Sequence, residues 1–213
     1  MLLSEEKRKQ ALHILSEQYP NPKPELNFGS PYELLVAVML SAQCTDKQVN
    51  KVTDELFKVA NTPEGVIALG EEKLMDMIHS CGFFRMKGKH ILETSRILLE
   101  RYGGEVPADR DTLTELPGVG RKTANVVVSN AFHIPAIAVD THVFRVSNRI
   151  GLAEAKTVEK TEEQLMAHIP REDWSDAHHW IIFHGRRVCA AQRPRCAGCA
   201  LNQICDFYTR KDS

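Results

Sequence analysis

Four cysteines near the carboxyl end of the chain are spaced like the ligands of a metal centre. They follow the pattern C-x6-C-x2-C-x5-C and are Cys189, Cys196, Cys199 and Cys205. Four thiolates so close together repel one another unless a cation neutralises them, so a metal centre is expected. Structural zinc usually takes two short cysteine pairs, and only Cys196 and Cys199 form one. The wide, uneven spacing modestly favours an iron–sulfur cluster over zinc.

Arginines surround the first two of these cysteines. They are Arg186, Arg187, Arg193 and Arg195. Basic side chains on a loop held by a metal centre suit phosphate groups. They could also offset the negative charge of the cysteines, and the two interpretations are compatible. The remaining cysteines, Cys44 and Cys81, lie far from this group, and we predict that both are buried thiols.

A glycine-rich turn precedes a second group of candidate residues, within the stretch LPGVGRKTA over residues 116–124. Gly118 and Gly120 permit a tight turn with accessible backbone N–H groups. A helix is expected to begin near Arg121, and its positive end favours a bound phosphate. That end also disfavours a protonated amine, and only the neutral amine of Lys122 is a nucleophile. By position alone, two solvated surface cations are the simpler interpretation.

A carboxylate opens the next helical segment, VDTHVFRV over residues 139–146. Asp140 is a good N-cap candidate. A carboxylate fixed there could also orient or deprotonate a reacting group, or stabilise a cationic sugar. His142 could assist or bind phosphate, although a lone histidine is more often structural. Eighteen residues separate Lys122 from Asp140, which is about one helix and a turn, so a shared cleft is a hypothesis only.

The elements that must position these residues are helical. Apolar residues recur at helical spacing after Ser30-Pro31 and in most later segments,. Alternating strand patterns with hairpin turns are lacking. The sequence therefore predicts an all-α protein. The stretch PNPKP over residues 20–24 is the clearest linker and follows an amino-terminal helix. Trp174, Trp180 and Phe183 are expected in the core.

Composition restricts the functional classes. The chain has 213 residues, 43% of them hydrophobic, and a net charge of −1. No run reaches the roughly 20 apolar residues of a membrane span, and the first residues do not resemble a signal peptide. We therefore expect a soluble intracellular protein. Residues 85–149 carry 10 Lys and Arg against 7 Asp and Glu. This basic block is compatible with DNA binding or with an ordinary solvated face.

Taken together, these motifs resemble the endonuclease III family of helix-hairpin-helix DNA glycosylases, which carry an iron–sulfur cluster. The motifs are LSAQCTD at residues 40–46, LPGVGRKTANVV at 116–127, VDTHVFRV at 139–146 and the cysteine tail. The resemblance extends from Ser30-Pro31 to Cys205. It implies two all-α lobes with DNA in the cleft between them. Residues 23–134 would form a six-helix barrel with the helix-hairpin-helix motif, and residues 1–22 with 135–213 the lobe that holds a [4Fe–4S] cluster.

The resemblance also implies a reaction: removal of oxidised or ring-saturated pyrimidines from duplex DNA in base excision repair. Lys122 would form a Schiff base at C1′ and nick the strand by β-elimination, with Asp140 as the essential carboxylate. Gln43 would fill the gap left by the flipped base, and Phe83 would wedge the opposite strand. Phe83 could instead belong to the core, or exchange roles with Phe84. The other expected DNA contacts are Gly118, Gly120, Arg121, His142, Arg186, Arg193 and Arg195.

Rival interpretations come from the same family and from outside it. A relative that removes adenine opposite oxidised guanine generally lacks the lysine and has a further carboxyl-terminal domain. Lys122 is present, and the chain ends eight residues after Cys205, so the pyrimidine-specific lyase is favoured. An enzyme specific for mismatches or pyrimidine dimers remains an alternative. A non-catalytic DNA clamp is another, against which Lys122 and Asp140 argue. We expect a monomer in the cytoplasm, associated with the nucleoid.

Overall fold

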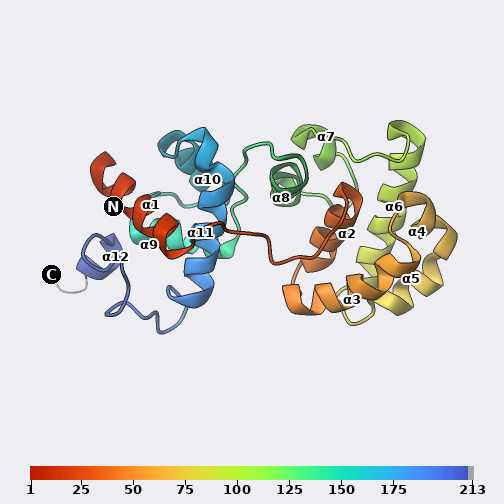
Figure 1. The fold of residues 1–213 in the computed structure, drawn as a ribbon, viewed down its shortest axis with the longest axis horizontal. Helices are drawn as coiled ribbons and strands as arrows, with labels where there is room; N and C mark the ends of the chain where they lie inside the picture. The colour runs from red at the N-terminus through yellow and green to blue at the C-terminus, as the bar shows by residue number, and fades with distance from the viewer. Residues whose placement is uncertain (211–213) are drawn as a thin grey trace. The chain divides into compact units, whose positions relative to one another are not determined.

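The computed structural model describes residues 1–210, and the regular elements within them are all helical (Figure 1). The prediction of an all-α protein is confirmed. The chain divides into two compact units. One is continuous from Pro24 to Ile134 and is called the central unit. The other joins Met1–Lys23 to the chain from Pro135 onward and is called the terminal unit.

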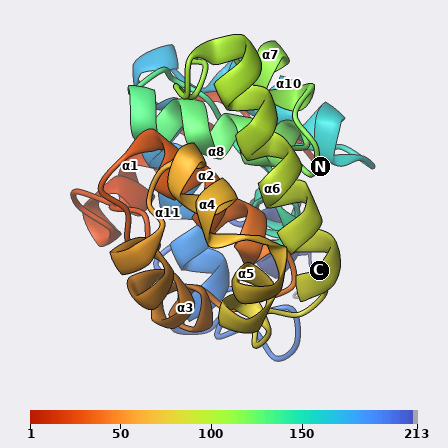
Figure 2. The same cartoon turned by 90° about the vertical axis from the view of Figure 1, so that its right-hand side faces the viewer.

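Seven helical segments build the central unit. They are α2 (Pro31–Ser41), α3 (Asp46–Val59), α4 (Pro63–Leu69), α5 (Glu71–Ile78), α6 (Phe84–Tyr102), α7 (Arg110–Thr114) and α8 (Arg121–Phe132). Helix α2 is apolar nearly all round, and it packs against α3, α6 and α8 (Figure 2). Seven of its consecutive residues, from Leu34 to Leu40, are buried. A helix buried on every side is the centre of a helical core.

Local sequence signals explain where these helices begin. The side chain of Ser30 accepts a hydrogen bond from the amide of Glu33, and Pro31 occupies the first turn of α2. Thr45 and Thr62 cap α3 and α4 in the same way. Each such cap stabilises a helix by about 1 kcal/mol. Gly70, with φ of 83°, ends α4 and begins α5 without a side-chain cap.

The terminal unit contains the first helix and the last ones. Its elements are α1 (Glu5–Gln18), α9 (Thr141–Ile150), α10 (Val158–His168), the short 3-10 helix η1 (Arg171–Asp173), α11 (Trp174–Arg187) and α12 (Asp206–Thr209). Helix α11 packs against both α1 and α9 (Figure 1). Trp180 and Phe183 are buried in this core as expected, and Trp174 packs at its edge. The amino-terminal ammonium also lies 2.6 Å from Oδ2 of Asp206, so it ties the start of the chain to α12.

Within residues 1–210, no helix combines the length and the apolar character that crossing a membrane requires.

Candidate functional site

The glycine-rich turn connects α7 to α8 and is held in place by α6. The amide of Val119 donates to the carbonyl of Leu116 at 3.1 Å, which closes the turn. From α6, Oγ1 of Thr94 donates to the carbonyl of Pro117 at 3.1 Å. The turn is therefore a fixed hairpin between two helices, as the sequence predicts.

Gly118 is required in this hairpin for two reasons. Its φ of 75° lies in the left-handed region, which disfavours residues with a Cβ,. A Cβ at this position would also come within 2.6 Å of Nδ1 of His90. Gly120 differs, because its φ is −87° and a Cβ there would meet nothing within 4 Å. Close packing against His90 thus explains why residue 118 is a glycine, whereas the space next to Gly120 is open.

Helix α8 begins directly after this open space. Gly120 is its N-cap and provides no side-chain hydrogen bond to the first turn. Helix N-termini present backbone N–H groups and a positive dipole end, which favour an anion. Arg121 and Lys122 lie in this first turn and are exposed. A helix start suited to an anion, with an exposed lysine in its first turn, is the central feature of the candidate site.

Two other turns of the central unit present exposed side chains side by side. Gln43 lies between α2 and α3 with φ of 54°, and Phe83 precedes α6 with φ of 58°. A Cβ on Gly82 would lie 3.8 Å from the carbonyl oxygen of Gln43, so the two turns are neighbours. Phe83 is 61% exposed and so does not belong to the core, whereas Phe84 is partly buried. The exposed aromatic and the amide face solvent from adjacent turns.

Asp140 caps α9, as the sequence predicts. Its Oδ1 accepts a hydrogen bond of 2.8 Å from the amide of Val143. The carboxylate is partly buried. Lys122 belongs to the central unit and Asp140 to the terminal unit. A common cleft for these two residues stays a prediction.

His142 is linked to the cysteine loop through one arginine. Nη2 of Arg145 lies 3.2 Å from Nδ1 of His142 and donates to the carbonyls of Gly185 and Cys189, both at 3.0 Å. Helices α9 and α11 cross closely here, because a Cβ on Gly185 would lie 2.9 Å from Cγ2 of Val146. The position of His142 is thus coupled to the start of the cysteine-containing loop.

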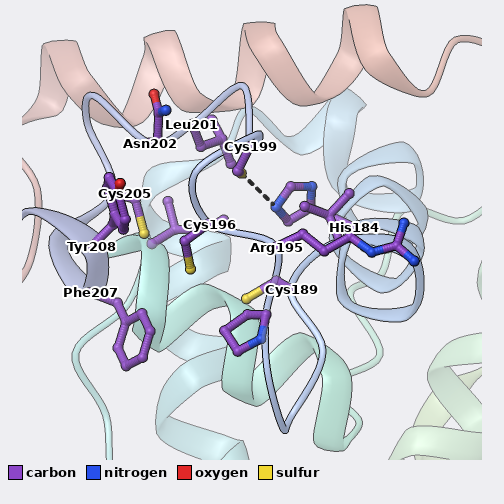
Figure 3. A pocket seen from close by; sticks show the side chains of 13 residues that line it. His184, Cys189, Arg195, Cys196, Cys199, Leu201, Asn202, Cys205, Phe207 and Tyr208 are labelled. Atoms are coloured by element: carbon purple, nitrogen blue, oxygen red, sulfur yellow. Dashed lines mark hydrogen bonds between the residues drawn. The ribbon is translucent and has the colours of Figure 1, made fainter.

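The four cysteines of the tail line a single pocket of the terminal unit (Figure 3). All four are free thiols, and the pocket holds about 340 Å³ of space between atoms, part of it open to solvent. Burial raises the pKa of Cys199 and of Cys205, and the charges of the neighbouring cysteines raise it further. Within residues 1–210, no three His, Cys, Asp or Glu side chains are arranged around a point where a single ion would sit.

A buried histidine also faces this pocket. His184 is 1% exposed, and its Nε2 lies 3.5 Å from Sγ of Cys199 (Figure 3). Its Nδ1 lies 3.3 Å from the hydroxyl of Tyr19 in α1. Burial lowers the pKa of His184 to about 4, so the imidazole is neutral at physiological pH. When Tyr19 donates to Nδ1, the hydrogen resides on Nε2 and points to sulfur.

Arg149 approaches the pocket from α9. Its guanidinium donates to Sγ of Cys189 at 3.6 Å and to the carbonyls of Ala190 and Ala191. It also lies over the ring of Phe207, at 4.8 Å from the centroid. Arg145 and Arg149 are one helical turn apart, so both reach the same loop. Arg186, Arg193 and Arg195 are exposed around that loop.

Sequence reasoning missed His184, Tyr19 and Arg149. The i, i+4 spacing of Arg145 and Arg149 after a predicted helix start was a usable signal. Helical spacing also places His184 near the first cysteine, but no local pattern connects Tyr19 to it, because the two are 165 positions apart. The prediction that Cys44 is buried was wrong in degree: Cys44 is partly exposed, and only Cys81 is fully buried.

Comparison with known proteins places this geometry in a family. Residues 36–171 match the family described as HhH-GPD superfamily base excision DNA repair protein, and the chain belongs to this family. It is 50% identical over 210 residues to Endonuclease III of Escherichia coli strain K12, covering 99% of this chain and 100% of that one. It is 52% identical to Endonuclease III of Bacillus subtilis strain 168 over 202 residues, covering 94% and 92% of the two chains.

A solved structure agrees with these relatives. It is described as a trapped Endonuclease III–DNA covalent intermediate in an estranged-adenine complex, and superposes with a TM-score of 0.94 at 47% identity, covering both chains completely. The fold of residues 1–210 is therefore that of the family.

Proposed function

We propose that this chain is a bifunctional DNA glycosylase and abasic-site lyase of base excision repair. One observation carries the proposal. An exposed lysine lies in the first turn of the helix that follows the glycine hairpin, in a chain half identical to Endonuclease III. A relative of that name has been solved as a covalent intermediate with DNA. A covalent enzyme–DNA species requires a nucleophile, and Lys122 is our candidate.

The reaction follows from an amine at this position. The target nucleotide is flipped out of the duplex, because C1′ of a stacked nucleotide is not accessible. The neutral Nζ of Lys122 attacks C1′ and displaces the base, and loss of a proton from nitrogen and opening of the sugar ring give a Schiff base. Removal of a C2′ proton then expels the 3′ phosphate by β-elimination. The products are a nicked strand and, after hydrolysis, free Lys122.

Asp140 supplies the carboxylate of the proposed reaction. Its oxygen on the amide of Val143 holds the side chain in one orientation. The other oxygen could stabilise positive charge on the sugar or accept a proton. The same hydrogen bond therefore serves the fold and the chemistry.

The four tail cysteines would hold a [4Fe–4S] cluster, which also fits the hydrogen-bond donors around them. Cluster sulfurs accept hydrogen bonds from the protein. Arg149 points at Cys189, and the neutral imidazole of His184 lies at Cys199. When bound, this group would supply no step of the base removal, and would fix the loop that carries Arg193 and Arg195. Those arginines and Arg186 would then bind the DNA backbone.

The substrate class is an oxidised or ring-saturated pyrimidine in duplex DNA. Gln43 would occupy the space of the extruded base, since its amide both donates and accepts hydrogen bonds. Phe83 would insert into the stack from the neighbouring turn, and its 61% exposure supports that role. Gly118, Gly120, Arg121 and His142 would contact phosphates. A panel of duplexes with single pyrimidine lesions tests this class directly.

Nicking of an abasic-site duplex in the presence of a chelator tests the activity itself. The lysine mechanism needs no dissociable metal, so we expect a 3′ product with an unsaturated sugar fragment. A protein that binds the duplex and leaves it intact would be a DNA clamp and would contradict the proposal. Release of adenine opposite oxidised guanine, without cleavage of pyrimidine lesions, would indicate the adenine-removing relative instead.

A further inference from the structure

Two cysteines outside the tail lie in the turns that carry Gln43 and Phe83. Cys44 directly follows Gln43, and Cys81 precedes Phe83 by two residues. Cys81 is completely buried, whereas Cys44 is partly exposed. Both are free thiols. One thiol is thus accessible to small solutes and the other is shielded from them.

The two thiols are within reach of each other. Burial, followed by the charge of Cys44 and a hydrogen bond with it, raises the pKa of Cys81 to about 11. The interaction between charges falls with distance, so this effect agrees with neighbouring side chains. The neighbouring backbone agrees, since a Cβ on Gly82 would lie 3.8 Å from the carbonyl oxygen of Gln43. Segments almost 40 residues apart in the sequence therefore meet at this pair.

A buried lysine accompanies the pair. Lys87 is 5% exposed, and its Nζ donates to the carbonyl of Leu40 at 2.8 Å. Burial lowers the pKa of Lys87, and the charges of Cys81 and Cys44 oppose that shift. The charge of Lys87 lowers the pKa of Cys81 but does not outweigh burial, so Cys81 is a protonated thiol and the partly exposed Cys44 is the sulfur that an oxidant reaches first. The three side chains are thus grouped behind the exposed turns.

We propose that Cys44 and Cys81 are a peroxide-sensitive thiol pair that closes to a disulfide between the Gln43 turn and the Phe83 turn. The modification itself depends only on the geometry of the pair. Its effect on activity rests on the proposed function, in which both turns enter the DNA stack. Disulfides of proteins in reducing compartments are commonly transient and redox-sensing.

The chemistry proceeds in two balanced steps. The partly exposed Cys44, as its thiolate, attacks one oxygen of a hydroperoxide, the O–O bond breaks, and the products are a sulfenic acid on Cys44 and water or an alcohol. The sulfur of Cys81 then attacks the sulfenic sulfur and loses its proton, while hydroxide leaves and takes up a proton as water. The pair loses two electrons to the peroxide. A thiol reductant reverses the reaction by exchange through a mixed disulfide.

In the proposed function, the Gln43 turn and the Phe83 turn adjust as they enter the DNA stack. The disulfide would restrain both turns. Gln43 and Phe83 already occupy left-handed backbone conformations, which are strained for residues with a Cβ and persist only where the surrounding structure holds them. A covalent link between the turns removes further freedom. Flipping of a base-paired lesion should then be slowed more than reaction at an abasic site, where the base is already missing.

Peptide mapping of the oxidised holoprotein tests the modification. The full chain is treated with hydrogen peroxide, alkylated and digested without reductant. We expect a cross-linked peptide that contains Cys44 and Cys81, lacks the two thiol hydrogens, and disappears after treatment with dithiothreitol. In Cys44→Ala the cross-link is absent and Cys81 remains alkylatable after denaturation. Alkylation of both cysteines in the treated wild-type chain, or their oxidation beyond the sulfenic acid without a cross-link, would overturn the proposal.

Activity measurements separate this proposal from the proposed function. We expect peroxide to reduce cleavage of a base-paired lesion by at least threefold in the wild type, and a thiol reductant to restore it. Cleavage by Cys44→Ala should be unaffected by peroxide when the two proteins have the same visible absorbance from the proposed cluster. Equal reversible losses in the wild type and in Cys44→Ala would overturn the regulatory effect. A cross-link in a protein that never cleaves DNA would support the thiol pair while contradicting the proposed function.

Discussion

Gly118 lies directly against His90, so that a Cβ on the glycine would come within 2.6 Å of Nδ1 of the imidazole. This contact joins the hairpin before α8 to helix α6. The hairpin leads directly into α8, so this contact also positions Lys122 in the first turn of that helix. The geometry of the proposed nucleophile therefore depends on a residue without a side chain.

Gly118→Ala should destabilise the protein and weaken DNA binding. The left-handed φ of 75° costs alanine about 1–2 kcal/mol,, and the clash with His90 adds about 1–3 kcal/mol. A fall in Tm of roughly 5–15 °C follows. Gly120→Ser is the matched control, because a Cβ there meets nothing and serine is a good N-cap,. Equal shifts of the Tm in the two variants, measured by thermal melting, would contradict this account of the hairpin.

Asp140→Asn should separate the structural role of this residue from its chemical role. Asparagine caps a helix about as well as aspartate, so α9 and the Tm should be nearly unchanged. The missing charge should lower single-turnover base removal by about 10²- to 10⁴-fold. Asp109→Asn is the control, because Asp109 caps α7 in the same way and has no proposed chemical role. Full activity of Asp140→Asn would leave Asp140 only a helix cap.

Phe83→Ala and Gln43→Ala should impair base flipping without affecting folding. Both side chains are exposed, so the free energy of unfolding should change by less than about 0.5 kcal/mol,. Loss of the inserted side chain should reduce cleavage of a base-paired lesion roughly 10- to 100-fold more than cleavage at an abasic site. Met86→Ala is the control, since Met86 is 55% exposed one turn further along α6. Equal losses on the two substrates would rule out the proposed role.

Iron content should follow the four tail cysteines. We expect about four iron atoms per chain, a brown protein, and no stoichiometric zinc. Cys199→Ser should lose iron and DNA affinity together, because the arginine loop would no longer be fixed. Cys44→Ser should keep the iron of the wild type, since Cys44 lies outside that pocket. Zinc bound at one equivalent in place of iron would contradict the proposed cluster.

The features that sequence reasoning found are those carried by local patterns. The cysteine spacing, the N-cap at Asp140 and the hairpin before Lys122 each lie within a few consecutive residues, where chain geometry is fixed by residue type. Contacts across long separations were not predictable in this way. The approach of Tyr19 to His184 and of Cys44 to Cys81 depends on how helices pack. The exposure of Phe83 also required the packed structure, because an aromatic residue at a helix start fits a core equally well.

Borohydride trapping of Lys122 tests the central claim most directly. Reduction of the Schiff base should give a stable protein–DNA adduct with an abasic-site duplex, and peptide mapping should place the adduct on Lys122. Lys122→Ala should give no adduct while it still binds the duplex, whereas Lys89→Ala, which removes an exposed lysine of α6, should trap like the wild type. Undiminished trapping in Lys122→Ala would place the nucleophile elsewhere and contradict the mechanism.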